Sequence, residues 1–421
     1  MLNKDNQREL VFVVAIDRIE PIPNADKVEL AYVGGWHIMV RKEQFKVGDP
    51  AIYFEIDSKV PEKEPFEFLA PKHYKVKTQK FIKGTVISQG LLMTAEDFGW
   101  EIYVNQKTNQ KGIIDTKGNL HLIDDESRFL TKQLEVTYAD AADQKRKSSS
   151  IDKYKKMASR HPQIFKKKSI RWLMKRTWGK KLLFLFFGKK KDKKGGWPSW
   201  VQKTDEERCQ NMPWLFTDDQ WKNTRWLVTE KIDGTSTTFT LKRKKHNKFE
   251  YHVCSRNVCF DLPEKRDHCF YDSNVYLEMS EKYHIEEALT KLFDVFSDCG
   301  VEFITLQGET YGEGIQKRTY SLNSHRFAAF NLILGFQYGT RRRLNTIEMR
   351  LFLDELPMHI PTVPIIEEDF VLPATCEELL QYAEGNSVLD DKEREGVVIR
   401  DYEGERSFKA VSNSFLMKYH G

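Results

Sequence analysis

Short runs of alternating apolar and polar residues dominate the amino-terminal part of the chain and restrict it to a β-rich fold. The first of these runs lie between Val11 and Asp57, and the turn sequences PNAD, GG and GD separate them. Runs of about five residues that are rich in Val, Ile, Tyr and Phe and bounded by such turns are typical of strands. Helical periodicity is nearly absent before residue 125, so we expect a small all-β unit there.

Two further strand-like runs, QKFIKGTVIS and QGLLMTAEDFG, complete this pattern. Small units built from several short strands and their turns are often barrels. We therefore assign residues 1–130 to an amino-terminal β-barrel module of the OB type.

A strongly basic segment follows this module. Residues 145–194 contain 20 of the 67 Lys and Arg residues but only two of the 62 Asp and Glu residues, so the rest of the chain is net negative. Such a concentration of positive charge indicates a polyanionic partner, with nucleic acid as the first candidate and an acidic membrane surface as the second. A solvated linker would explain the same composition. We assign residues 131–196 to a basic linker, which ends at Gly195-Gly196.

The residues after position 200 mix strand-like runs with one clear helical pattern. Apolar residues from Val275 to Phe296 recur at helical spacing, which predicts a helix around residues 274–299. The other runs, among them RWLVTEKIDGTSTTFTLKR and EGVVIRDYEG, favour strands. Residues 197–421 are therefore expected to form a sheet-dominated α+β domain.

The composition excludes several classes of protein. Hydrophobic residues make up 40% of the chain and charged residues 31%, and no apolar run approaches the roughly 18 residues that a membrane-spanning helix needs. The six cysteines include no C-x-x-C pair, which argues against a disulfide framework and a zinc ribbon. The start, MLNKDNQREL, lacks the apolar core of a secretory signal. We expect an intracellular, monomeric protein without a membrane partner, and the composition does not distinguish cytoplasm from nucleus.

The string Glu230-Lys231-Ile232-Asp233-Gly234 is the strongest indication of chemistry in the chain. It lies between two strand-like runs, where packing alone would not select a lysine followed by an acid and a glycine. Five segments follow it in order: SRN at 255–257, QGETYG at 307–312, FAAFN at 327–331, EGVVIR at 395–400 and SFKAVSN at 407–413.

These six segments and their order resemble the motifs of the covalent nucleotidyltransferases, the superfamily of ATP-dependent DNA ligases, RNA ligases and mRNA-capping enzymes. Upstream, the string KTDEER at 203–208 resembles the entry segment of RNA ligases. The string PIPNADKVELAYVGGWHIMVRKEQFKVGD resembles the OB module of an RNA ligase subfamily. The resemblance implies that the second domain is a sheet-rich nucleotidyltransferase domain of the ATP-grasp-like ligase type.

Two lysines are expected to perform the chemistry. Lysine can act as a nucleophile only when its amine is neutral, a state that burial and nearby cations favour. By resemblance, Lys231 is the nucleophile that forms a covalent bond to AMP, and Lys409 faces the α-phosphate of ATP. A cation at Lys409 would lower the pKa of the nearby amine and stabilise the transition state.

Three acids are expected to hold the metal. Asp233, Glu309 and Glu395 each lie beside a glycine, and converging carboxylates are the ligands that hard divalent cations prefer. The resemblance implies that they bind Mg²⁺ or Mn²⁺ near the α-phosphate.

The remaining site residues are expected to hold the nucleotide. Arg256 offers a planar fork for the ribose or for a 5′-phosphate, and the ring of Phe330 suits stacking on adenine. The resemblance implies an ATP site formed by Glu230, Lys231, Arg256, Glu309, Phe330, Glu395 and Lys409.

The sequence departs from the family pattern at one position. RNA ligases commonly have a second lysine two residues after the one matched by Lys409, and this chain has Val411 there. Lys418 is a candidate replacement.

We therefore expect an ATP-dependent RNA ligase that joins RNA 3′-OH and 5′-phosphate ends through a lysyl-AMP and an adenylylated RNA. A DNA ligase or a capping enzyme would share the lysine motif, but both usually carry the OB module after the catalytic domain. An OB-containing RNA-binding protein with an inactive second domain is the other alternative. The intact Lys231, Glu309, Glu395 and Lys409 argue against it.

Overall fold

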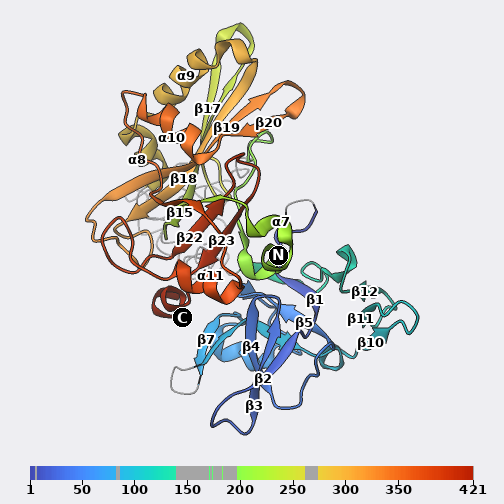
Figure 1. The fold of residues 1–421 in the computed structure, drawn as a ribbon. Helices are drawn as coiled ribbons and strands as arrows, with labels where there is room; N and C mark the ends of the chain where they lie inside the picture. The colour runs from blue at the N-terminus through green and yellow to red at the C-terminus, as the bar shows by residue number, and fades with distance from the viewer. Residues whose placement is uncertain are drawn as a thin grey trace.

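The structure is a computed structural model that describes residues 1–4, 7–81, 86–138, 197–260 and 274–420, and the single positions 170, 173 and 183. Figure 1 shows two parts, an amino-terminal module in blue and cyan and a larger part in green to red. Most of the predicted basic linker lies outside the described residues. The stretch 131–138, which we assigned to that linker, packs on the amino-terminal module through the buried Val136.

Short antiparallel strands build the amino-terminal module, as the alternating pattern predicts. The central sheet has the order β1-β5-β9, and a second sheet has the order β2-β3-β4. The strands are β1 Val11–Ala15, β2 Arg18–Pro21, β3 Val28–Val33, β4 Trp36–Arg41, β5 Pro50–Phe54, β6 Ser58–Lys59, β7 Thr78–Phe81, β8 Val86–Gln89, β9 Leu91–Met93, β10 Glu101–Val104, β11 Lys111–Ile114, β12 Leu120–Leu122 and β13 Thr137–Tyr138.

Every residue of β5 is buried, because both faces of the central sheet are covered by apolar side chains. Within the described residues, the strands of the module pair into several separate sheets, and backbone pairing does not close them into one barrel. The prediction of a β-rich module is thus confirmed, whereas a closed barrel is not seen in this part of the chain.

Two five-stranded sheets form the framework of the larger part. One has the order β14-β23-β22-β15-β21 and the other the order β17-β16-β18-β19-β20. The strands of the first sheet are β14 Glu207–Arg208, β15 Trp226–Lys231, β21 Ile365–Phe370, β22 Gly396–Arg400 and β23 Ser407–Val411. Those of the second are β16 Thr235–Arg243, β17 Phe249–Ser255, β18 Val301–Gly312, β19 His325–Phe336 and β20 Arg341–Arg343.

Helices cover the outer faces of these sheets. They are α6 Trp214–Thr217, α7 Asp219–Lys222, α8 Val275–Lys282, α9 Ile285–Val295, α10 Thr346–Asp354, α11 Cys376–Ala383 and α12 Asn413–Phe415. The single helix predicted around residues 274–299 is two helices, because His284 adopts a left-handed conformation with φ 47° between α8 and α9. Apolar residues of both helices pack into one core, which explains why their spacing is continuous in the sequence.

The two parts are joined by direct contacts. Trp36 Nε1 donates to Asn211 Oδ1 at 2.7 Å, and Gln89 Nε2 donates to Asn413 Oδ1 at 2.8 Å. Val411 and Leu416 contribute to a buried apolar cluster whose other buried members belong to the amino-terminal module. The module therefore packs on the same end of the first sheet that carries β23.

No helix within the described ranges is both long enough and apolar enough to cross a membrane.

Candidate active site

Lys231 is the last residue of β15, at the point where the chain leaves the first sheet. Lys231 pairs with Gly396 on β22, so the strand register places the neighbouring Glu395 beside it. The Lys231 Nζ atom lies 2.6 Å from Glu395 Oε1, and both side chains are largely buried. Two segments separated by more than 150 residues thus meet in one ion pair, as the motif order predicts.

Glu309 approaches this pair from the second sheet. It lies on β18 opposite Ser236 of β16, close to where the chain turns from Lys231 into β16. Burial raises the pKa of the Glu309 carboxyl to about 8; Lys231 opposes this shift, and the carboxylates of Glu395 and Asp233 add to it. Glu309 is therefore mostly protonated at neutral pH in the ligand-free protein.

The same cluster controls the protonation of Lys231. Burial by itself lowers the pKa of this amine, but Glu395, Glu309 and Asp233 together raise the pKa above its usual value. The ligand-free protein thus holds Lys231 as an ammonium ion. This differs from the expectation that nearby cations would keep the amine neutral, because the three carboxylates outweigh the effect of burial on its pKa.

Lys409 is a second buried lysine, on β23 of the first sheet. Its pKa is lowered to about 8, mainly by burial and further by Arg8, Arg208 and Lys231, while Asp205 opposes the shift. The two lysines therefore differ in their electrostatic environment. Carboxylates stabilise Lys231 as a cation, whereas burial and three neighbouring cations outweigh the one carboxylate, Asp205, near Lys409.

Asp205 is the counter-ion that connects these cations. Its carboxylate lies 2.8 Å from Arg8 Nε, 3.4 Å from Lys409 Nζ and 3.3 Å from Arg256 Nη2. Its pKa lies well below the usual range because these three cations outweigh the effect of burial. Arg256, predicted to bind the nucleotide, thus lies near the lysines through Asp205.

Glu230 and Asp233 flank the nucleophile but point in different directions. The Glu230 carboxylate accepts hydrogen bonds from Ser387 Oγ at 2.5 Å and from the Val388 backbone N–H at 2.8 Å. It therefore anchors the loop at 387–388. The Asp233 backbone N–H donates to Tyr320 Oη at 2.6 Å, and the Asp233 side chain is buried near Lys231 and Glu309.

Phe330 is half-buried and forms a bulge of β19, because Asn331 pairs with Gln307 of β18 and Ala329 pairs with the next residue, Gly308. It packs against Ile232, Tyr320 and other residues of a small cluster between the two sheets. Arg400 Nη1 donates to its backbone carbonyl. The ring thus lies beside the residue that follows Lys231, in a position compatible with stacking on a base.

The lack of space around Gly234 explains why the lysine motif ends in glycine. A Cβ atom at this position would lie 2.3 Å from the Thr310 backbone oxygen and 2.9 Å from Glu309 Cγ. Any larger residue would push β18, and with it Glu309, away from Lys231.

Comparisons with known families assign both parts of the chain. Residues 10–95 match the model of an OB-fold domain family. Residues 224–420 match the model of the RNA ligase family. Residues 224–420 thus belong to the RNA ligase family. This range includes every site residue that we predicted from the sequence, and the OB-fold match confirms the class of the amino-terminal module.

Solved structures show that the whole chain shares the fold of an RNA ligase. A variant of Naegleria gruberi RNA ligase with ATP and Mn is 23% identical, with a TM-score of 0.66, over 98% of this chain and 99% of that one. A second variant with AMP and Mn is 24% identical with a TM-score of 0.67, over 98% and 99% of the two chains. A comparison with curated proteins found no match.

The site around Lys231 has the chemistry of a divalent cation site without a preformed cage. Within the described ranges, no three His, Cys, Asp or Glu side chains are arranged to hold a metal ion. Mg²⁺ often takes only one or two carboxylates and completes its shell with water and phosphate oxygens. The carboxylates of Glu395, Glu309 and Asp233 around Lys231 are hard oxygen ligands, so they fit such an ion.

The sequence did not identify two residues that the ligase fold places beside Lys409. Arg208 pairs with Lys409 in the parallel strands β14 and β23, and Arg8 reaches it from the amino-terminal module through Asp205. Lys418, the candidate for a second motif lysine, instead lies at the surface in a 2.5 Å ion pair with Glu393. Only the KTDEER string signalled Asp205 and Arg208, and nothing in the sequence signalled Arg8.

Proposed function

We propose that this protein is an ATP-dependent RNA ligase that joins RNA 3′-OH and 5′-phosphate ends. The observation that carries the proposal is the buried contact between Lys231 and Glu395, with Glu309 and Asp233 in electrostatic reach. A lysine held in a cluster of carboxylates, with a second lysine of lowered pKa close by, suits nucleotidyl transfer better than packing. Membership of residues 224–420 in the RNA ligase family and the ATP and AMP in the related structures support it.

The reaction then consists of three transfers. In the first, Lys231 Nζ attacks the α-phosphorus of ATP, a bond between nitrogen and phosphorus forms, and pyrophosphate leaves. In the second, an oxygen of the RNA 5′-phosphate attacks the same phosphorus, and Lys231 is released from AMP. In the third, the RNA 3′-OH attacks the 5′-phosphorus and AMP leaves, which completes the phosphodiester bond.

The residues around Lys231 prepare the first transfer. The amine must lose a proton before it attacks, and Glu395, at 2.6 Å, is within reach to accept it. Asp233, Glu309 and Glu395 would hold Mg²⁺ or Mn²⁺, which supplies charge neutralisation for the phosphate oxygens. Lys409 faces the α-phosphate, and Arg256 and Phe330 hold the ribose and the base.

Labelling with radioactive nucleotide tests the first transfer directly, and the joining of RNA rather than DNA ends is tested by a sealing assay with each. Wild-type protein is incubated with α-labelled ATP or GTP and a divalent cation, and then separated on a denaturing gel. We expect a covalent label from ATP alone. A label from GTP would indicate a capping-type enzyme, and no label from either nucleotide would indicate an inactive RNA-binding protein.

The lowered pKa of Lys409 predicts how ATP binding depends on pH. A lysine with a pKa of about 8 carries its charge below that pH and loses it above. We therefore expect the KM for ATP in lysine adenylylation to rise as the pH increases through about 8. The Lys409→Arg variant keeps its charge, so its KM should stay flat over the same range. An equal rise in both proteins would show that another group is responsible.

A further inference from the structure

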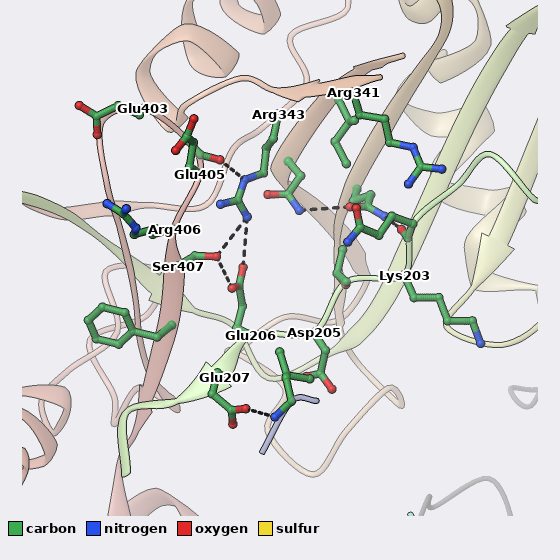
Figure 2. Close-up of a pocket in the computed structure, with 18 of the residues that line it drawn as sticks. Lys203, Asp205, Glu206, Glu207, Arg341, Arg343, Glu403, Glu405, Arg406 and Ser407 are labelled. Atoms are coloured by element: carbon green, nitrogen blue, oxygen red, sulfur yellow. Dashed lines mark hydrogen bonds and ion pairs between the residues drawn. The ribbon is translucent and has the colours of Figure 1, made fainter. Parts of the chain in front are cut away.

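A cavity of about 800 Å³ lies next to the ligase site but is lined by none of the site residues that we predicted from the sequence. Figure 2 shows this pocket, with Arg341 and Arg343 on one side and Asp205 and Glu206 on another. Asp205 is shared between the two, because it also lies 3.4 Å from Lys409. The pocket therefore opens beside the wall that carries the Lys409 counter-ion, and its volume lies in the range of ligand sites.

Arginines of β20 form one wall of the pocket. Arg343 pairs with Ile333 of β19, which also lines the pocket, so their side chains lie on the same face of the sheet. Side chains two positions apart on a strand share a face, so Arg341 lies on that face as well. Arg343 is held by the Gly404 carbonyl at 2.7 Å and by Ser407 Oγ at 3.1 Å. Arg341 is exposed and forms no ion pair with any described residue. It thus presents a guanidinium that is available to an anion.

Two buried amide side chains, those of Gln307 and Asn331, also line the pocket. Gln307 Nε2 donates to the Gln202 carbonyl at 2.8 Å, and Asn331 Nδ2 donates to Gln307 Oε1 at 3.1 Å. Asn331 is 4% exposed, yet its Oδ1 accepts no hydrogen bond from the described part of the chain. A buried acceptor without a donor is costly. A ligand with an amino or hydroxyl group would satisfy it.

An apolar wall and several acidic side chains complete the lining of the pocket. Met212, Leu215 and the 41% exposed Trp214 line the pocket and offer surface for a flat ring. Glu206 is already bound by Arg400 Nη2 at 3.1 Å and by Ser407. The exposed Glu403 and Glu405 would repel a continuous phosphate backbone. The pocket therefore suits a ligand with one base and one phosphate better than a duplex.

We propose that this pocket binds one unpaired nucleotide of the RNA substrate, with its phosphate on Arg341 and its base against the apolar wall and Asn331. Aromatic and apolar surfaces stack on bases, and arginine contacts hold phosphates, in sites for single strands. The inference rests on the proposed function and adds a subsite that distinguishes single-stranded from duplex RNA.

The test uses the full chain and two variants with different signatures. Binding of a short single-stranded RNA with a 5′-phosphate is measured by fluorescence anisotropy at several salt concentrations. Arg341→Gln should weaken binding about three- to tenfold and reduce the log–log salt slope by about 0.7, because one phosphate contact is lost. Asn331→Leu should weaken binding without changing the slope, since Asn331 is uncharged. Arg350→Gln, on α10 and paired with Asp354, is the matched control.

The outcomes separate this inference from the proposed function. The subsite is overturned if both variants bind single-stranded RNA with the affinity and the salt slope of the wild-type protein. It is also overturned if Arg341→Gln weakens the binding of duplex RNA as much as the binding of single-stranded RNA. If Arg341→Gln lowers lysine adenylylation by the same factor as it lowers RNA affinity, Arg341 belongs to the ATP site. That result would also overturn the RNA subsite. Failure of the wild-type protein to form a labelled adduct with ATP would instead refute the proposed function. Circular dichroism confirms that each variant is folded.

Discussion

The Lys231→Ala variant is expected to form no covalent adduct with labelled ATP, because no other side chain at this position can attack the α-phosphorus. The ion pair at 2.6 Å shows that the amine is directed into the carboxylate cluster. ATP-dependent sealing should fall below detection, and sealing of RNA that is already adenylylated should partly survive. The measurement is a denaturing gel for the adduct and a sealing assay with each RNA.

A control lysine makes this experiment specific. Lys222 is exposed on α7 and pairs with Asp219, so Lys222→Ala should be labelled like the wild type. Removing Lys231 leaves Glu395 and Glu309 without their cation, so the fold of the variant must be checked by thermal denaturation. A labelled adduct in folded Lys231→Ala would show that another residue is the nucleophile.

Glu309→Ala and Glu395→Ala should each lower the adenylylation rate by about two orders of magnitude or more. The loss of a charged contact to the metal or the transition state costs roughly 3 kcal/mol in enzyme sites. The rate is measured by single-turnover labelling with ATP at saturating metal. Glu313 is exposed in the turn after β18, so Glu313→Ala is the matched control.

The corresponding glutamine variants separate the two roles of these acids. Glu309 is mostly protonated in the ligand-free protein because its pKa is about 8, so Glu309→Gln should keep the native stability while adenylylation still falls. Glu395→Gln removes the closest anion from Lys231 and should lower the pKa of the amine. If Glu395→Gln adenylylates at the wild-type rate, Glu395 acts only as the counter-ion of Lys231.

The sequence could name candidate site residues because each motif is short and contains its own chemistry, and the roles of these residues stay predictions. The order of the motifs correctly predicted that Lys231, Glu309 and Glu395 would lie close together. The sequence could not predict that carboxylates outweigh cations around Lys231, since this depends on distances across two sheets. It also could not predict that Glu230 anchors the 387–388 loop.

Contacts between distant segments were the main omission. Arg8 and Asp205 are separated by almost 200 residues, and no local pattern signals that they meet. The break between α8 and α9 was missed for a related reason. The left-handed His284 interrupts the backbone, but the apolar faces on both sides pack into the same core and retain one periodicity.

The buried Glu55 of the amino-terminal module links the two modules through ion pairs. It lies 2.6 Å from Arg8 of its own module and 3.7 Å from Arg208, which follows the linker in the chain. The Met1 amino group also lies 2.6 Å from Glu55, so Glu55 is the common anion of three cations, and its loss would cost about 3–5 kcal/mol. An amino-terminal module that replaces this one must therefore supply a carboxylate at the place of Glu55 for Arg208.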